Sequence, residues 1–184
     1  MHVSAFGEPC QAPTLRCGFQ SCSERRHVNA KETVMALYAA YASGDAQRIA
    51  ALLHEDVVWI APAGNATQVA LGLGQASDAG APTDGNNLGR DLIVQFMAHN
   101  FARLFVDAKN EFRSLVSDGD TAFAEHRLSA TLPNGRRYVN DYCFSYRVEN
   151  GQVRHIREYM DTRGGWAQVF GDGPPSTLLD FVRR

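Results

Sequence analysis

Three tight turns divide residues 110–162 into four segments, and this spacing constrains the fold more than any other feature of the chain. The turns are Asp118-Gly119-Asp120, Pro133-Asn134-Gly135 and Glu149-Asn150-Gly151. Each contains an Asp-Gly or Asn-Gly pair, which tolerates positive φ, and each stands between runs rich in Tyr, Phe, Val and Thr. The sequence therefore predicts an antiparallel meander of four strands.

Helical patterns precede the meander. Asn29 opens a capping-box pattern, and apolar residues then recur with helical spacing as far as Gly44, which ends the helix. Asp45 begins a second, shorter helix, residues 56–60 have the β-branched and aromatic content of a strand, and a broad apolar face predicts a third helix over residues 90–105. Helices segregated from a mostly antiparallel sheet define an α+β fold class.

Composition divides the chain into one folded domain and its flanking segments. Residues 1–28 have no apolar period and are expected to form a flexible N-terminal extension, residues 29–170 form the domain, and residues 171–184 form a C-terminal tail. Residues 63–89 are rich in glycine and have few apolar anchors, which leaves two interpretations open. This loop insertion is either a lid over a pocket or an ordinary mobile segment.

Charge and cysteine spacing argue against several classes of partner. The 184 residues carry 18 basic and 20 acidic side chains, a formal net charge of -2, so we expect neither nucleic acid nor membrane as a partner. No apolar run reaches the roughly 20 residues that span a bilayer, and we expect a cytoplasmic protein. Cys10, Cys17 and Cys22 lack the Cys-x-x-Cys spacing of zinc sites, so we expect no metal and no other cofactor.

The order of these elements and three stretches of sequence resemble the NTF2-like superfamily and, within it, the SnoaL-like proteins related to ketosteroid isomerase. The stretches are residues 39–45 (AAYASGD), 54–59 (HEDVVW) and 151–161 (GQVRHIREYMD). The resemblance covers residues 29–170. It implies a curved sheet wrapped around three N-terminal helices, a conical pocket for a small-molecule ligand, and a homodimer. Because members include isomerases, polyketide cyclases and epoxide hydrolases, it implies no single reaction.

The functional residues of two groups of relatives carry over only in part. Ketosteroid isomerases place a general-base Asp at the end of the first strand, where this chain has Ala61, and an oxyanion-binding Tyr near the position of Tyr38. Limonene-epoxide hydrolases hold water with an Arg and an Asp two residues apart on one strand and an Asp on the last strand. In register with their Leu-Pro-x-Gly turn, these positions fall on Glu125, Arg127 and Glu158.

The resemblance therefore places the face of the strand that carries Glu125 and Arg127 inward, beside Glu158. With Glu158 as a general base, Arg127 orienting it and Glu125 sharing the network, the cluster suits an isomerase, cyclase or hydrolase type of proton transfer on a moderately apolar substrate. The substrate-binding walls implied by the relatives are Trp59, Asn140, Tyr142, Tyr38 and Phe144.

Two alternatives stay open beside this hypothesis. An acid and an Arg two residues apart on a strand, opposite another acid, often form only a cross-strand ion pair on a solvated face. The domain could also bind a ligand or dimerise without catalysing a reaction. By alternation along the strands, His126 and His155 are expected at the surface or an interface, and Arg157 and Asp161 at a dimer surface or the strand end. Neither periodicity nor resemblance identifies a substrate.

Overall fold

The computed structural model describes residues 29–62, 65–71 and 87–171. Its elements are α1 (Ala30–Ser43), α2 (Ala46–Leu52), β1 (Leu53–Ile60), α3 (Ala66–Ala70), β2 (Asn87–Leu88), α4 (Arg90–Gln95), the π-helical segment η3 (Phe96–Asn100), α5 (Phe101–Leu104), β3 (Val106–Asp118), β4 (Thr121–Thr131), β5 (Arg137–Glu149), β6 (Gln152–Met160) and α6 (Thr162–Phe170).

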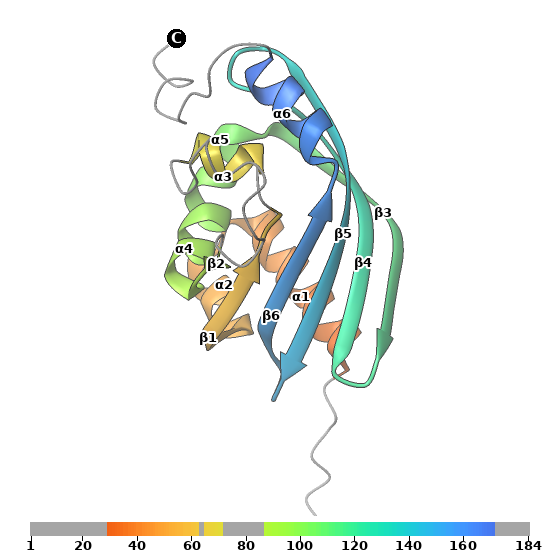
Figure 1. Cartoon of the computed structure of the whole chain (residues 1–184). Coiled ribbons are helices and arrows are strands. Elements are labelled where there is room, and N and C mark those ends of the chain that lie inside the picture. Colours follow the sequence, from red (N-terminus) through yellow and green to blue (C-terminus); the bar gives the residue numbers. More distant parts are fainter. Residues whose placement is uncertain (1–28, 63–64, 72–86, 172–184) are drawn as a thin grey trace, which may run out of the picture.

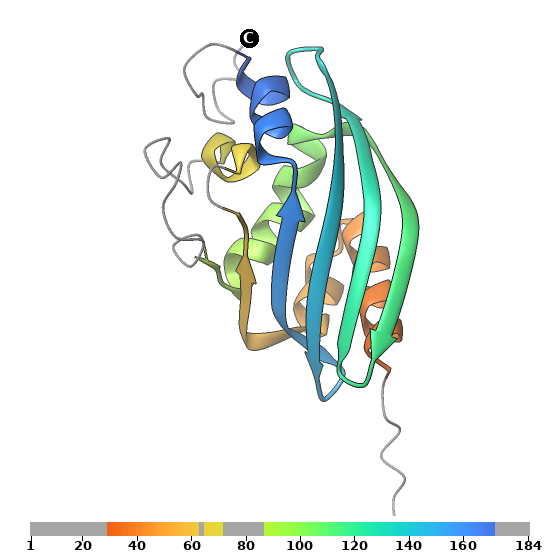
Figure 2. The ribbon, with the colours of Figure 1, turned by 45° about the vertical axis from the view of Figure 1, so that its right-hand side comes forward.

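A curved sheet of six strands forms one layer of the domain, and the helices before β3 lie against its concave side (Figures 1 and 2). The strand order is β2-β1-β6-β5-β4-β3. β1 pairs with β6 in parallel, and the other neighbours are antiparallel. α1 packs on β3, β4 and β5, and α4 packs on β1. The predicted α+β class and the curved sheet around helices are confirmed.

The predicted turns join β3 to β4, β4 to β5 and β5 to β6, so the meander is confirmed. Gly119, Gly135 and Gly151 have φ angles of 58°, 81° and 80°, and Asn150 has a φ of 50°. These backbone conformations are accessible to glycine at no steric cost and are tolerated by Asn. The residue types at the turns therefore account for the hairpins.

The first helix begins and ends as predicted, and the second begins as predicted but ends at Leu52, where β1 follows directly. The side chain of Asn29 accepts a backbone hydrogen bond at the start of α1, and Gly44 ends this helix with a φ of 64°. Asp45 caps α2 by accepting two backbone hydrogen bonds. The third helix, predicted over residues 90–105, is divided into α4 and α5 by the π-helical segment, which the apolar spacing did not indicate.

Part of the segment 63–89, which we expected to be one loop, has regular structure. Residues 66–70 form the short helix α3, and residues 87–88 pair with β1 as β2. Residues 63–64 and 72–86 lie outside the described residues, as do residues 1–28 and 172–184. The lid interpretation, the extension and nearly all of the tail therefore stay predictions.

The helix α6, which follows β6, was not predicted. It packs on β5 (Figure 1), where the side-chain amide of Gln168 accepts a hydrogen bond from the backbone nitrogen of Val139 at 2.6 Å and donates one to its carbonyl oxygen at 3.0 Å. Because β6 ends opposite Tyr142, Val139 lies beyond its reach. The side-chain amide of Gln168 thus makes the backbone hydrogen bonds to Val139 that a neighbouring strand would otherwise make.

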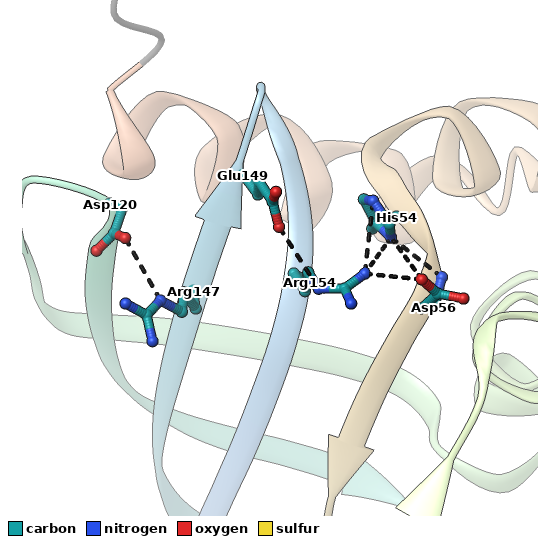
Figure 3. A network of polar contacts seen from close by, with 6 residues as sticks. All are labelled: His54, Asp56, Asp120, Arg147, Glu149 and Arg154. Atoms are coloured by element: carbon teal, nitrogen blue, oxygen red, sulfur yellow. Dashed lines mark hydrogen bonds and ion pairs between the residues drawn. The ribbon is translucent and has the colours of Figure 1, made fainter.

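Charged side chains connect three strands near the turn between β5 and β6 (Figure 3). Nη1 of Arg154 on β6 lies 2.7 Å from Nδ1 of His54 and 3.0 Å from a carboxylate oxygen of Asp56, both on β1. Nε of Arg154 lies 3.5 Å from Glu149 on β5. These contacts bridge β1 and β6 where the register of their backbone pairing shifts.

The hydrophobic core fills the space between the helices and the concave side of the sheet. Fully buried side chains include Leu37, Ile49, Ile93, Leu104 and Ile156. Within the described ranges, no helix is both long and apolar enough to cross a membrane.

Candidate functional site

A cavity of about 510 Å³, partly open to the outside, extends into the core. This volume lies within the range of small-molecule sites, which are mostly apolar with a few polar groups. The cavity extends from α1 and β1 across α3 and the η3–α5 segment to the inner faces of β4, β5 and β6. Its apolar walls include Phe96, Met97, Phe101, Phe105, Leu128 and Phe144. The pocket implied by the resemblance is therefore present.

Glu158 on β6 places a buried carboxyl group in this cavity. Its side chain is 6% exposed, and each carboxylate oxygen accepts one hydrogen bond. Nε1 of Trp59 donates to Oε2 at 3.0 Å, and Nδ2 of Asn65 donates to Oε1 at 3.1 Å. Burial raises the pKa of Glu158 to about 7, although the two hydrogen bonds act in the opposite direction. Near neutral pH this carboxyl group can therefore accept or release a proton.

The strand register explains how Trp59 reaches Glu158. In the parallel pairing of β1 with β6, Trp59 lies beside Ile156, and Glu158 follows two residues later on the same face. Asn65 reaches the same carboxylate from α3. Because Oδ1 of Asn65 caps that helix by accepting two backbone hydrogen bonds, Nδ2 is left to donate to Glu158. The cap therefore fixes the orientation of the amide.

Replacing Trp59 by Phe is expected to raise the pKa of Glu158 by about one pH unit, since a hydrogen bond to a charged group favours its ionised form. The titration of the carboxyl carbon in a ¹³C NMR spectrum measures this directly. Trp166→Phe is the matched control because Trp166 packs against Phe170 of α6, outside the cavity wall. An unchanged or lower midpoint in Trp59→Phe would contradict the assigned hydrogen bond.

A second set of polar side chains in the cavity consists of two tyrosines and a histidine that are linked in a chain. The hydroxyl of Tyr146 donates to the hydroxyl of Tyr38 at 2.8 Å, and the latter lies 3.4 Å from Nδ1 of His126. Burial lowers the pKa of His126 to about 4 and raises the pKa of both phenols, so all three groups are neutral at pH 7. With Tyr38 donating to Nδ1, the proton of the imidazole lies on Nε2.

Glu125 and Arg127 do not join Glu158, and the prediction that their face points inward is wrong. Arg127 makes two hydrogen bonds of 2.8 Å with Asp141, and Glu125 lies 3.5 Å from Arg113. These four side chains are substantially solvent-exposed on the convex side of the sheet. The alternative of a cross-strand ion pair on a solvated face describes Glu125 and Arg127.

The opposite face of β4 lines the cavity, which corrects the expectation for His126. This side chain is 5% exposed and forms part of the cavity wall. Its ring lies nearly parallel to those of Tyr142 and Phe144, at interplanar angles of 11° and 5°. His155 and Arg157 are exposed as expected, and Asp161 lies at the end of β6 as expected, where it caps α6.

Four of the five predicted wall residues line the cavity: Trp59, Tyr142, Tyr38 and Phe144. Asn140 is buried, but it does not line the cavity. Its side chain donates to the carbonyl oxygen of Asp161 at 2.9 Å and to the hydroxyl of Tyr138 at 3.3 Å, so it anchors the start of α6. Sequence reasoning missed Asn65 and Gln68, which also line the cavity.

No group of three His, Cys, Asp or Glu side chains in the described part of the chain is arranged to hold a metal ion.

Comparison with known proteins finds a matching family model and several solved structures with a similar fold. Residues 34–156 match the family model of the SnoaL-like domain. An NTF2-like protein of unknown function from Burkholderia pseudomallei is 23% identical, with a TM-score of 0.57 over 73% of this chain and 92% of that protein. No curated protein matches the chain.

Two further solved structures have names that refer to a ligand or an activity. IdmH from Streptomyces antibioticus, for which a polyketide cyclase activity is proposed, is 21% identical, with a TM-score of 0.58 over 76% of this chain and 96% of its own. TerC, crystallised with polyporic acid, is 22% identical, with a TM-score of 0.59 over 76% and 96% of the two chains. At these identities the likeness shows a shared fold.

Proposed function

Because the chain belongs to the SnoaL-like domain family, we propose that its cavity binds a moderately apolar small molecule and that Glu158 transfers a proton to or from it. One observation carries the proposal: a carboxyl group with a pKa of about 7 lies in a largely apolar cavity, held by Trp59 and Asn65. A general base is most effective when its pKa lies near the working pH.

The neighbouring side chains suit such a step. Both hydrogen-bond donors to Glu158 are neutral, so they orient the carboxylate without suppressing its basicity as a bound cation would. Neutral His126, whose proton lies on Nε2 when Tyr38 donates to Nδ1, can donate to an oxygen atom that gains negative charge as the proton leaves carbon. Isomerisation and cyclisation both begin this way, and the activity proposed for IdmH is a cyclisation. Addition of water is the third candidate class.

The alternative function is ligand binding without catalysis, which the apolar walls of the cavity would also support. The two functions differ in the expected effect of Glu158→Gln. In an enzyme this change removes proton transfer and leaves a ligand bound, whereas in a binding protein no proton-transfer activity depends on Glu158. The test therefore measures, in both forms of the protein, the rate of proton transfer from a small acidic probe and the affinity for it.

We also propose that the protein forms a homodimer through the convex face of the sheet. Val116, Phe123 and Tyr159 are 57%, 46% and 53% exposed there. The strand pairings place them on the same face as Glu125. Exposed apolar side chains beside both signs of charge suit contact with a second copy across a twofold axis, where each patch meets its own equivalent.

Replacing Phe123 by Glu is expected to convert this dimer to a monomer, because it adds a charge at the centre of the apolar patch in both copies. Sedimentation velocity measures the outcome. Met35→Glu is the control, since Met35 is similarly exposed, at 55%, but lies on α1. A monomeric wild-type protein, or a variant as dimeric as the wild type, would rule out this interface.

A further inference from the structure

In the described part of the chain, the cavity wall contains acidic residues but neither Lys nor Arg. The acidic residues are Glu158, which is buried, and Asp107, which is exposed on β3. The one histidine of the wall, His126, is neutral at pH 7 because burial lowers its pKa to about 4. Arg103 and Lys109 flank this part of the wall in sequence but do not line it. The wall therefore offers no positive charge to an anionic ligand.

The exposed residues of the wall form the mouth of the cavity. They come from the C-terminal end of α1 (residues 42–44), from α5 and from the start of β3 (residues 106–110). Asn29, which caps the start of α1, contacts Ser117 near the end of β3, and Tyr38 packs on Phe112 farther back along this strand. The C-terminal end of α1 therefore faces the start of β3.

Asp107 has an unusual backbone conformation at this mouth. Its φ angle is 52°, in the left-handed region that Asp and Asn tolerate better than most residues. The register of β3 against β4 shifts between Val106 and Lys109, which indicates a β-bulge. In a regular strand consecutive residues face opposite sides, whereas Val106, Asp107 and Ala108 all line the cavity. The bulge therefore keeps Asp107 at the mouth.

The surroundings of Asp107 favour a positive charge in a ligand. Within the described ranges, its carboxylate forms neither an ion pair nor a hydrogen bond. The C-terminal end of α1 at the same mouth carries a partial negative charge, because the last carbonyl groups of a helix have no partners within it. The N-terminus of α2 would act in the opposite sense, but the carboxylate of Asp45 already caps it. The exposed side chain of Asn110 offers a further acceptor oxygen.

We propose that the mouth of the cavity binds the protonated amino group of a ligand whose apolar ring system lies in the interior, with Asp107 as the counter-ion. The ammonium group donates hydrogen bonds to this carboxylate and to carbonyl oxygens at the end of α1. Carboxylates and phosphates of similar size bind poorly because they meet only negative charge. The inference rests on the proposed use of the cavity as a ligand site, and it adds the chemical class of the ligand.

Three naphthalene derivatives of similar size test the proposal at pH 7. Naphthylmethylamine is cationic, naphthylmethanol is neutral and naphthoate is anionic. By fluorescence titration at low ionic strength, the wild-type protein is expected to bind the amine about fivefold more tightly than the alcohol, the gain expected from an exposed ion pair, and naphthoate most weakly. In about 1 M salt, where the Debye length is about 3 Å, the preference for the amine falls to about twofold or less.

Asp107→Asn is expected to reduce this preference to about twofold or less at low ionic strength. Asn has nearly the size of Asp and tolerates the positive φ angle, but it carries no charge. Asp118→Asn makes the same change in net charge at the exposed other end of β3, and this control is expected to retain the preference. Asp107→Gly, which also accepts the φ angle, replaces Asp107→Asn if the latter does not fold, as judged by circular dichroism.

The possible failures of this inference can be told apart from a failure of the proposed function. Wild-type protein that binds the alcohol or naphthoate as tightly as the amine would overturn the amine site alone. A preference that persists in Asp107→Asn would also overturn it, since the ammonium group would then pair elsewhere in the cavity. Wild-type protein that binds none of the three compounds would overturn both this inference and the use of the cavity as a ligand site.

Discussion

Glu158→Gln is expected to slow proton transfer from 5-nitrobenzisoxazole by about 10²- to 10⁴-fold, the range typical of a lost general base. In this reaction a base removes the proton on the ring carbon, the N–O bond breaks, and a yellow nitrophenolate is released, so the assay needs no native substrate. Gln has nearly the shape of Glu but cannot accept the proton. Absorbance spectroscopy follows the rate.

Two further measurements make this test specific. The wild-type rate is expected to rise with pH and to level off above about pH 7, because burial raises the pKa of Glu158 to about 7 and the ionised form is the base. Glu125→Gln removes a carboxyl group from the convex face and is expected to leave the rate unchanged. Equal rates in Glu158→Gln and the wild type would remove Glu158 from its assigned role.

The fold could be predicted largely from local sequence because its boundaries depend on backbone conformation. The Asn150-Gly151 pair adopts the positive φ angles that close a tight hairpin, and Gly44 and Asp45 end one helix and begin the next. The π-helical segment was not predictable in this way. Its residues, Phe96–Asn100, continue the apolar face of the helices around them. The sequence pattern therefore does not reveal the change from α-helical to π-helical hydrogen bonding.

The face that points into the core was predicted correctly on β6 and wrongly on β4, and the difference has a physical reason. Glu158 shares its face with the apolar Ile156, which directs that face into the core. On β4 the resemblance favoured the charged face, although the face that carries His126 also carries Ala122, Ala124 and Leu128. A polar residue among apolar neighbours is the more probable inward position on a half-buried strand. That signal would have identified His126.

Asn65 and Gln68 were not predicted as cavity residues because Asn65 caps, and Gln68 lies on, a helix of only five residues. α3 lies within a glycine-rich segment and is too short for a helical spacing of apolar residues to be recognised. The Asn residue before Ala66 is a favourable N-cap, and this was the only local indication of a helix. The approach of α3 to Glu158 depends on tertiary packing, which links residues 93 positions apart.

The free energy of unfolding of Glu158→Gln is expected to gain about 3 kcal/mol relative to the wild type as the pH rises from 4.5 to 7. Burial raises the pKa of Glu158 from 4.5 to about 7, so the folded protein keeps this proton in a range where the unfolded chain has released it. The stability supplied by the protonated group is complete below pH 4.5 and is lost as the pH rises through 7. Gln has no proton to lose.

His126 opposes Glu158 in the same pH range, so comparison of variants is needed to separate the two groups. Burial lowers the pKa of His126 from 6.5 to about 4, so its contribution is present above pH 6.5 and is lost as the pH falls through 4, also by about 3 kcal/mol. In the wild type the two contributions nearly cancel between pH 4.5 and 6.5. Urea unfolding at several pH values should show stability rising with pH in Glu158→Gln and falling in His126→Phe, while the exposed Glu125→Gln follows the wild type. Parallel curves for all four proteins would mean that neither group titrates in a buried environment.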